Sequence, residues 1–153
     1  MKFVLTPVIV AAALLLSACT PKVAPLGEQP STPHLTEAGF ITDDGMTLPV
    51  RTWLPPGGPE KVSAVVLALH GFNDYSKAFD KVPGAPGVGP VLADQGIAVY
   101  AYDQRGFGKS SNPGVWAGDD VLVGDFKTFA RALKLRYPQV PLYALGESMG
   151  GAV

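Results

Sequence analysis

The chain has 153 residues, a formal net charge of -1 and a hydrophobic content of 47%. A charge this close to zero, with no clustered basic run, argues against nucleic acid as a partner. Cys19 is the only cysteine, which excludes an intrachain disulfide.

The N-terminus has the pattern of a secretory signal. Lys2 supplies one positive charge, residues 8–16 form an apolar run, and Leu16-Ser17-Ala18-Cys19 ends it with small residues. The run is shorter than the roughly 20 residues that a transmembrane helix needs. Two interpretations stay open, a plain signal peptide with a free thiol and a signal for lipidation.

Leu-Ser-Ala-Cys resembles the bacterial lipobox. The resemblance implies that residues 1–18 are a lipoprotein signal peptide, that Cys19 is lipidated, and that this lipid attaches the protein to a membrane. In such lipoproteins an aspartate after the cysteine favours the inner membrane. Thr20 stands there in this chain, so the expected location is the bacterial cell envelope, at the outer membrane.

Residues 19–34 are expected to form a Pro-rich tether. They carry four prolines and little apolar content, which favours a semi-extended chain. The globular part is therefore expected to cover residues 35–153.

A hairpin and a buried strand are predicted at the start of this part. Extended segments at 37–42 and 46–53 flank Asp43-Asp44-Gly45, and Asp-Gly between such segments is a hairpin signal. Pro49 cannot donate to a strand ladder on one side, so the hairpin is placed at a sheet edge. Residues 62–69 are almost continuously apolar and valine-rich, which is typical of a strand buried on both faces.

His70-Gly71 follows that strand directly. A turn of this kind after a buried strand can provide a backbone donor to an oxyanion hole, and here the donor is expected to be the backbone amide of Phe72. His70 precedes the candidate serine described below, against the usual order of serine, acid and histidine, so a structural role in orienting the loop is predicted. His34 is expected to be solvated.

The middle of the chain continues the alternation of helix and strand. Residues 75–89 are expected to form a loop, 90–95 a short helix ended by Gly96, and 97–102 an apolar strand. The Gly-x-Gly at 106–108 lacks the Walker pattern and a third Rossmann glycine, so it is interpreted as a structural turn.

A long amphipathic helix is predicted between Asp119 and Pro138. Apolar residues recur every three or four positions, acidic residues open the helix, and basic residues lie in its last turn. The apolar stripe is interpreted as a core face, and no metal or cofactor site is predicted. The alternation of strands and helices indicates a parallel sheet with helices on its faces.

Gly146-Glu147-Ser148-Met149-Gly150-Gly151 follows a short apolar segment at 140–145 that is expected to be a buried strand. A Gly-x-Ser-x-Gly between a strand and a helix is a nucleophile elbow. The sharp turn presents Ser148 and leaves no space for side chains at Gly146 and Gly150. The amide of Met149 is expected to point at the oxyanion position.

Three motifs in this order, His-Gly-Phe-Asn, Asp-Gln-Arg-Gly-Phe-Gly-Lys-Ser and Gly-Glu-Ser-Met-Gly-Gly, resemble the monoacylglycerol lipase and lysophospholipase branch of the α/β-hydrolases, often labelled serine aminopeptidase-like. The resemblance covers about residues 35–153. It implies the N-terminal portion of an α/β-hydrolase fold, with a mostly parallel sheet, an antiparallel N-terminal hairpin and helices on both faces. It also implies a small acyl ester substrate of lipid type, Ser148 as nucleophile, and the amides of Phe72 and Met149 as oxyanion donors.

Two departures from the family pattern qualify this expectation. Glu147 stands where many members of the branch have histidine, and both histidines of the chain precede Ser148. The acid and histidine of the triad are therefore expected beyond Val153, in a longer enzyme of which this inactive fragment is the N-terminal part. The alternatives are a catalytically inactive, lipid-anchored binding protein and a peptidase of the same fold, because esters and amides share the triad chemistry.

Overall fold

The computed structural model describes residues 22–80 and 83–153. The expected signal peptide and Cys19 lie outside the described residues. Within the part that is described, no helix has the length and apolar character needed to cross a membrane.

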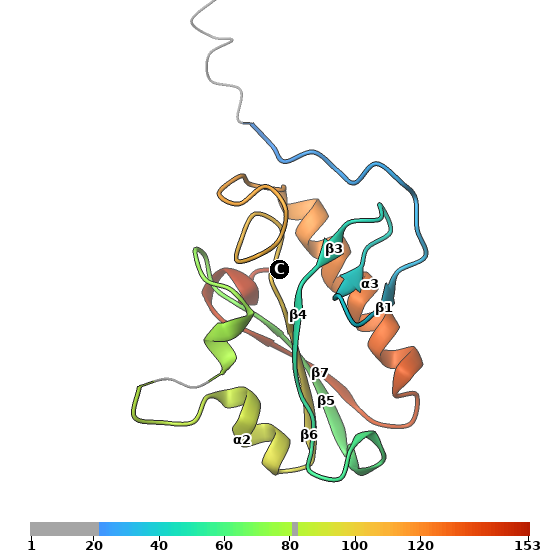
Figure 1. Ribbon diagram of the computed structural model, residues 1–153, viewed down its shortest axis with the longest axis vertical. Helices are drawn as coiled ribbons and strands as arrows, with labels where there is room; N and C mark the ends of the chain where they lie inside the picture. The colour runs from blue at the N-terminus through green and yellow to red at the C-terminus, as the bar shows by residue number, and fades with distance from the viewer. Residues whose placement is uncertain (1–21, 81–82) are drawn as a thin grey trace, which may run out of the picture.

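A four-stranded sheet forms the centre of the molecule (Figure 1). Its order is β4 (Val50–Trp53), β6 (Ile97–Tyr102), β5 (Ala64–Leu69) and β7 (Leu142–Gly146). β5 runs parallel to both β6 and β7, while β4 is antiparallel to β6. All six residues of β5 are buried, because strands flank it on both sides and packed layers cover both of its faces. The predicted, mostly parallel sheet with a central buried strand is confirmed.

Two helices cover opposite faces of this sheet, α2 (Val88–Asp94) and α3 (Asp119–Arg136). Successive residues of β5 point to opposite faces, so they enter two separate apolar cores. The core on the α3 side contains Val65, Leu67, Leu69, Phe129 and Leu133, and the core on the α2 side contains Val66, Ala68, Phe79, Val99 and Leu92. The predicted stripe of α3 is thus a core face.

The expected hairpin is present in a small separate sheet. β1 (His34–Leu35), β2 (Phe40–Ile41) and β3 (Thr47–Leu48) pair antiparallel in this order. Phe40 stacks on Phe129 of α3 with ring centroids 4.3 Å apart, which fastens this sheet to the helix. The second expected arm does not stay in the hairpin, because the chain passes through Pro49 into β4 and the central sheet.

Three local expectations need correction. α2 begins at Val88, two residues earlier than expected, and the 75–89 loop contains a 3-10 turn, η2 (Ser76–Phe79), that buries Phe79. β7 is not the buried strand that its apolar sequence predicted, since Tyr143 is 58% exposed. The physical reason is that β7 pairs only with β5 among the described residues and so forms a sheet edge.

The N-terminal segment is extended, as expected, but it lies against the body (Figure 1). Ala24 is buried and donates its backbone N–H to the carbonyl of Trp116 at 2.7 Å. Further along, Gly27 donates its N–H to Asp44 Oδ2 at 2.7 Å, and Ser31 donates to the carbonyl of Asp43 at 2.8 Å. The sequence did not indicate these contacts, which join residues 24–31 to the globular part.

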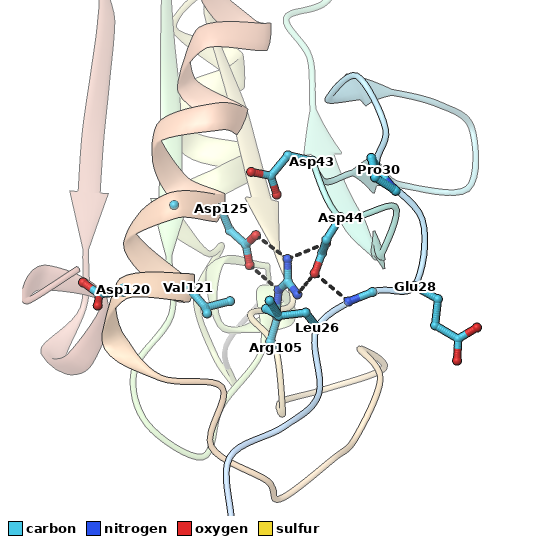
Figure 2. A pocket seen from close by; sticks show the side chains of 11 residues that line it. Leu26, Glu28, Pro30, Asp43, Asp44, Arg105, Asp120, Val121 and Asp125 are labelled. Carbon is cyan, nitrogen blue, oxygen red and sulfur yellow. Dashed lines mark hydrogen bonds and ion pairs between the residues drawn. The ribbon is translucent and has the colours of Figure 1, made fainter.

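Arg105 is a buried cation at the junction of these elements (Figure 2). Its side chain is 3% exposed. It donates to both oxygens of Asp125 in α3, at 2.7 and 2.8 Å, and to both oxygens of Asp44 in the β2–β3 turn, at 2.6 and 2.9 Å. Asp44 also accepts hydrogen bonds from the hydroxyl of Thr42 and the amide of Gly27. One guanidinium therefore holds the hairpin, α3 and the N-terminal segment together.

Burial and pairing with Arg105 have opposite effects on the pKa values of these two carboxyl groups. Burial by itself raises the pKa of Asp44, but hydrogen bonds from Arg105, Thr42 and Gly27 outweigh it and lower that pKa well below its ordinary value of 3.8. The more deeply buried Asp125 has a raised pKa because burial dominates, although Arg105 opposes the rise. Asp125 therefore depends most on Arg105 to remain ionised at neutral pH.

Arg105→Gln should lower the free energy of unfolding by about 3–5 kcal/mol at pH 7, because it leaves the Asp125 carboxylate buried without a compensating charge. The loss should shrink as the pH is lowered from 7 to 5. An unpaired Asp125 has a folded-state pKa above its unfolded value, so protonation favours the folded state as the pH falls. Urea titrations at both pH values measure this. Arg131→Gln, at an exposed position of α3, is the control and should change stability by less than about 0.5 kcal/mol.

Candidate active site

The Gly-x-Ser-x-Gly segment forms a sharp turn between β7 and a 3-10 turn, η3 (Ser148–Gly151). Ser148 has φ 50°, in the left-handed region that non-glycine residues rarely adopt. A residue persists there only when the surrounding structure fixes it, and such residues cluster at active sites. The elbow geometry matches the expectation, with a 3-10 turn in place of an α-helix after the serine.

Two glycines allow the elbow to pack closely. A Cβ at Gly146 would lie 2.4 Å from the carbonyl oxygen of Gly150, and a Cβ at Gly150 would lie 2.3 Å from the carbonyl oxygen of Leu69. Both obstacles are backbone atoms, so side chains are excluded at these two positions, as the motif predicted. Glu147 N–H donates to the same Leu69 carbonyl at 3.0 Å, which fastens the elbow to the end of β5.

The turn after β5 lies directly against Ser148. Gly71 is buried, and a Cβ placed on it would be 3.4 Å from Ser148 Cβ. Ser148 is exposed, and the Phe72 side chain is 70% exposed. The structure thus brings together Ser148, Met149 and the turn that carries Phe72, although these segments are more than 70 residues apart in the chain.

His70 is wholly buried behind this turn. Its Nε2 accepts the backbone N–H of Gln104 at 3.0 Å, and its Nδ1 lies 2.8 Å from the carbonyl of Gly71. Because Nε2 accepts an amide hydrogen, the ring proton resides on Nδ1 and is donated to Gly71. Burial lowers the pKa of His70, which keeps the ring neutral. Both nitrogens are occupied in the scaffold, so the predicted structural role is confirmed.

The bond from His70 fixes the orientation of one peptide unit. The Gly71 carbonyl and the Phe72 N–H belong to the same peptide, and none of the described peptide bonds is cis. In a trans peptide the carbonyl and the N–H point in opposite directions. With its carbonyl held by His70, this peptide directs the Phe72 N–H away from His70. Gln104 supports the turn again by donating Nε2–H to the His70 carbonyl at 2.9 Å; the sequence did not single out this residue.

The Gly-x-Gly loop is structural, as predicted. Asp103 accepts the N–H of Ser76 at 2.9 Å through Oδ1 and the N–H of Lys109 at 2.8 Å through Oδ2. Gly108 has φ 58°, and a Cβ there would lie 2.3 Å from Asp103 Oδ2. The Asp103 carboxylate therefore joins this loop, through the amide of Lys109, to the turn η2, through the amide of Ser76.

An aromatic pocket of about 460 Å³ begins at the Phe72 turn. The Phe72 ring meets Phe107 edge-on, with centroids 5.5 Å apart. The remaining lining residues are Asn73, Asp74, Tyr75, Gly106, Gly108, Pro113, Gly114, Val115 and Trp116. The hollow beside Arg105 in Figure 2 is larger, about 520 Å³, but neither the elbow nor the Phe72 turn lines it. The aromatic pocket therefore meets the candidate site at the Phe72 turn, while no residue of the elbow lines it.

Among the described residues, no cluster of histidine, cysteine, aspartate or glutamate could hold a metal ion. His34 is exposed, and its Nδ1 lies 2.7 Å from the carbonyl of Thr32. Cys19, the expected lipidation site, lies outside the described residues.

Comparison with known proteins decides the family. The profile described as "Serine aminopeptidase, S33" matches residues 60–153. The chain belongs to this α/β-hydrolase family. It is 32% identical to "Monoglyceride lipase" of Rattus norvegicus over 128 residues, which cover 79% of this chain and 36% of that protein. It is also 32% identical to "Monoacylglycerol lipase" of Mycolicibacterium smegmatis over 119 residues, 77% of this chain and 39% of that one.

Solved structures agree on the fold. A "Lipase (Open form)" superposes with a TM-score of 0.54 at 24% identity, covering 75% of this chain and 36% of that one. A soluble variant of monoglyceride lipase from Saccharomyces cerevisiae, in complex with a substrate analog, has a TM-score of 0.52 at 24% identity, covering 85% and 41%. The S33 chain thus has the N-terminal strands and helices of an α/β-hydrolase and spans less than half the length of these relatives.

Gly150→Ala should destabilise the protein and displace the elbow, because the added Cβ would meet the carbonyls of Leu69 and His70 at 2.3 and 2.8 Å. Gly124→Ala is the matched control. No atom would lie within 4 Å of its new Cβ, and it stands inside α3, so it should raise the free energy of unfolding by up to about 1 kcal/mol. Thermal melts measure both variants. A change of melting temperature in the same direction for the two substitutions would contradict this prediction.

Proposed function

We propose that Ser148 is the nucleophile of a serine hydrolase that cleaves carboxylic esters of lipid type, such as monoacylglycerols or lysophospholipids. The observation that carries the proposal is the strained Ser148, held by Gly146 and Gly150 at the end of β7 beside the Phe72 turn. The names of the S33 relatives, monoglyceride lipase among them, support the substrate class.

In the proposed reaction, Ser148 Oγ attacks the ester carbonyl and loses its proton to a general base. The amides of Phe72 and Met149 donate to the oxyanion, the alcohol leaves with a proton, and water then hydrolyses the acyl-enzyme. The chain contains two histidines, and His70 has both ring nitrogens occupied. His34 is held by Thr32 in the small N-terminal sheet. The acid and histidine of the triad are therefore proposed to come from outside residues 1–153.

Without its base, the serine should be nearly inert. A complete triad contributes on the order of a millionfold in turnover, so the 153-residue chain alone should hydrolyse neither p-nitrophenyl esters nor monoacylglycerols above background. The alternatives are an inactive, lipid-anchored binding protein and a peptidase. The first predicts no labelling of any extended chain, and the second predicts a preference for short N-terminal peptides over lipid esters.

A chain extended by its native downstream sequence should react stoichiometrically with a fluorophosphonate, and Ser148→Ala should abolish this reaction while changing the melting temperature little. Ser111→Ala, at another exposed serine, should label like the wild type. Mass spectrometry of the labelled peptide identifies the site. If the extended wild type stays unlabelled, the binding-protein alternative replaces the hydrolase.

We also propose that Cys19 carries lipid and anchors the protein in the bacterial envelope, at the outer membrane. Labelled fatty acid should enter the wild type, whereas Cys19→Ala should remain unlabelled and uncleaved by the lipoprotein pathway. Thr20→Asp should stay labelled but shift to the inner membrane in density-gradient fractions. Equal labelling of wild type and Cys19→Ala would contradict the lipobox interpretation.

A further inference from the structure

The distance between the proposed anchor and the body is short. Among the residues that the structure describes, from residue 22 onward, Ala24 is the first that is both buried and hydrogen-bonded to the body. It follows Cys19 by five residues in the sequence. A fully extended chain covers about 3.3–3.6 Å per residue, so five residues reach at most about 18 Å. A tether that stayed free to residue 34 would reach about 50 Å. Docking of the segment therefore keeps the body close to any lipid on Cys19.

Exposed apolar side chains gather where the segment docks. Val23 is 53% exposed and adjoins Ala24, whose N–H is bonded to Trp116, itself 41% exposed. Trp116 and the 70% exposed Phe72 both line the aromatic pocket. We call Val23, Phe72 and Trp116 the aromatic face. Figure 1 shows the N-terminal segment entering the body beside the loop that follows β6.

The chemistry of this face suits the boundary of a bilayer. Tryptophan is favoured at membrane–water interfaces, where its apolar rings and its N–H are both satisfied. Among the described residues, Asp74 is the one charged residue that lines the aromatic pocket, whereas Glu28, Asp43 and Asp120 line the separate hollow beside Arg105.

We propose that the aromatic face lies against the bilayer that holds the lipid of Cys19, so that the aromatic pocket opens toward the membrane. This inference rests on the proposed lipidation and deepens the proposed function. In this orientation a lipid ester passes from the bilayer to the Phe72 turn without passage through water. The occupant is the bilayer itself, chosen by the reach of five residues between Cys19 and Ala24.

The two tryptophans of the chain provide a reporter and its control. Trp116 belongs to the aromatic face. Trp53 pairs with Val99 in the central sheet, and Val99 lies three residues before Tyr102, the last residue of β6. The ring of Trp53 packs against Gly89 of α2. In the 153-residue chain, Trp53→Phe leaves Trp116 as the single tryptophan emitter, and Trp116→Phe leaves Trp53.

The test uses the 153-residue chain, purified with its lipid and reconstituted into phosphatidylcholine vesicles that contain brominated acyl chains. Trp116 emission should be quenched at least twofold more than Trp53 emission. Val23→Glu in the Trp53→Phe background should remove most of the Trp116 quenching. Leu135→Glu should not, because Leu135 is 83% exposed at the opposite end of α3, about 25 Å along the helix.

The possible outcomes distinguish the membrane contact from the lipid anchor. Fatty-acid labelling of Cys19 with equal quenching of the two tryptophans overturns the membrane contact and leaves the anchor standing. Absence of labelling removes the anchor, and the membrane contact falls with it. Reaction of Ser148 with fluorophosphonate is measured separately, so failure of the hydrolase proposal is distinguishable from both.

Discussion

A buried arginine needs compensating charge, and this requirement organises much of the chain. Arg105 satisfies it with carboxylates from two distant places, Asp44 at 61 residues and Asp125 at 20 residues of separation. Asp44 in turn binds the amide of Gly27, so the course of the N-terminal segment depends on the same charge. Gln104, the residue before Arg105, holds His70 through two hydrogen bonds. The ion pair thus connects the N-terminal segment to the turn that carries Phe72.

Strain at the site is tolerated because neighbouring residues fix the backbone on which the exposed Ser148 stands. Ser148 and Asn73 are both non-glycine residues with positive φ, at 50° and 60°, and such a conformation costs about 1–3 kcal/mol. Each lies beside a point where backbone meets backbone: the elbow against Leu69, and the Phe72 turn against the elbow. If these contacts were looser, both residues could leave the left-handed region, and the side chain of Ser148 would no longer be held in its exposed position.

Strong local periodicity explains what could be predicted. β5 and β6 are continuous apolar runs, and α3 has an apolar stripe and end charges that agree, so tertiary context had little to override. The elbow was predictable because its glycines report a backbone requirement. The contacts of Asp44 and Gly27 were not, since no local signal links residues so far apart. An arginine three residues after the end of a buried strand did offer a hint, because a buried charge in that position needs a partner. The exposure of β7 could not be inferred from its apolar sequence, because burial depends on which strands pair with it.

The hydrogen bonds of His70 also determine what this histidine cannot do. Its Nε2 faces the Gln104 amide, a donor that cannot reverse its polarity, so a proton on Nε2 would place two donors against each other. Burial adds a second penalty by disfavouring the imidazolium. A general base must accept a proton and become charged in every turnover, which this environment opposes on both counts. The same two features make His70 a rigid brace for the Gly71–Phe72 peptide, so this histidine has a structural role and the base of the proposed reaction must be another group.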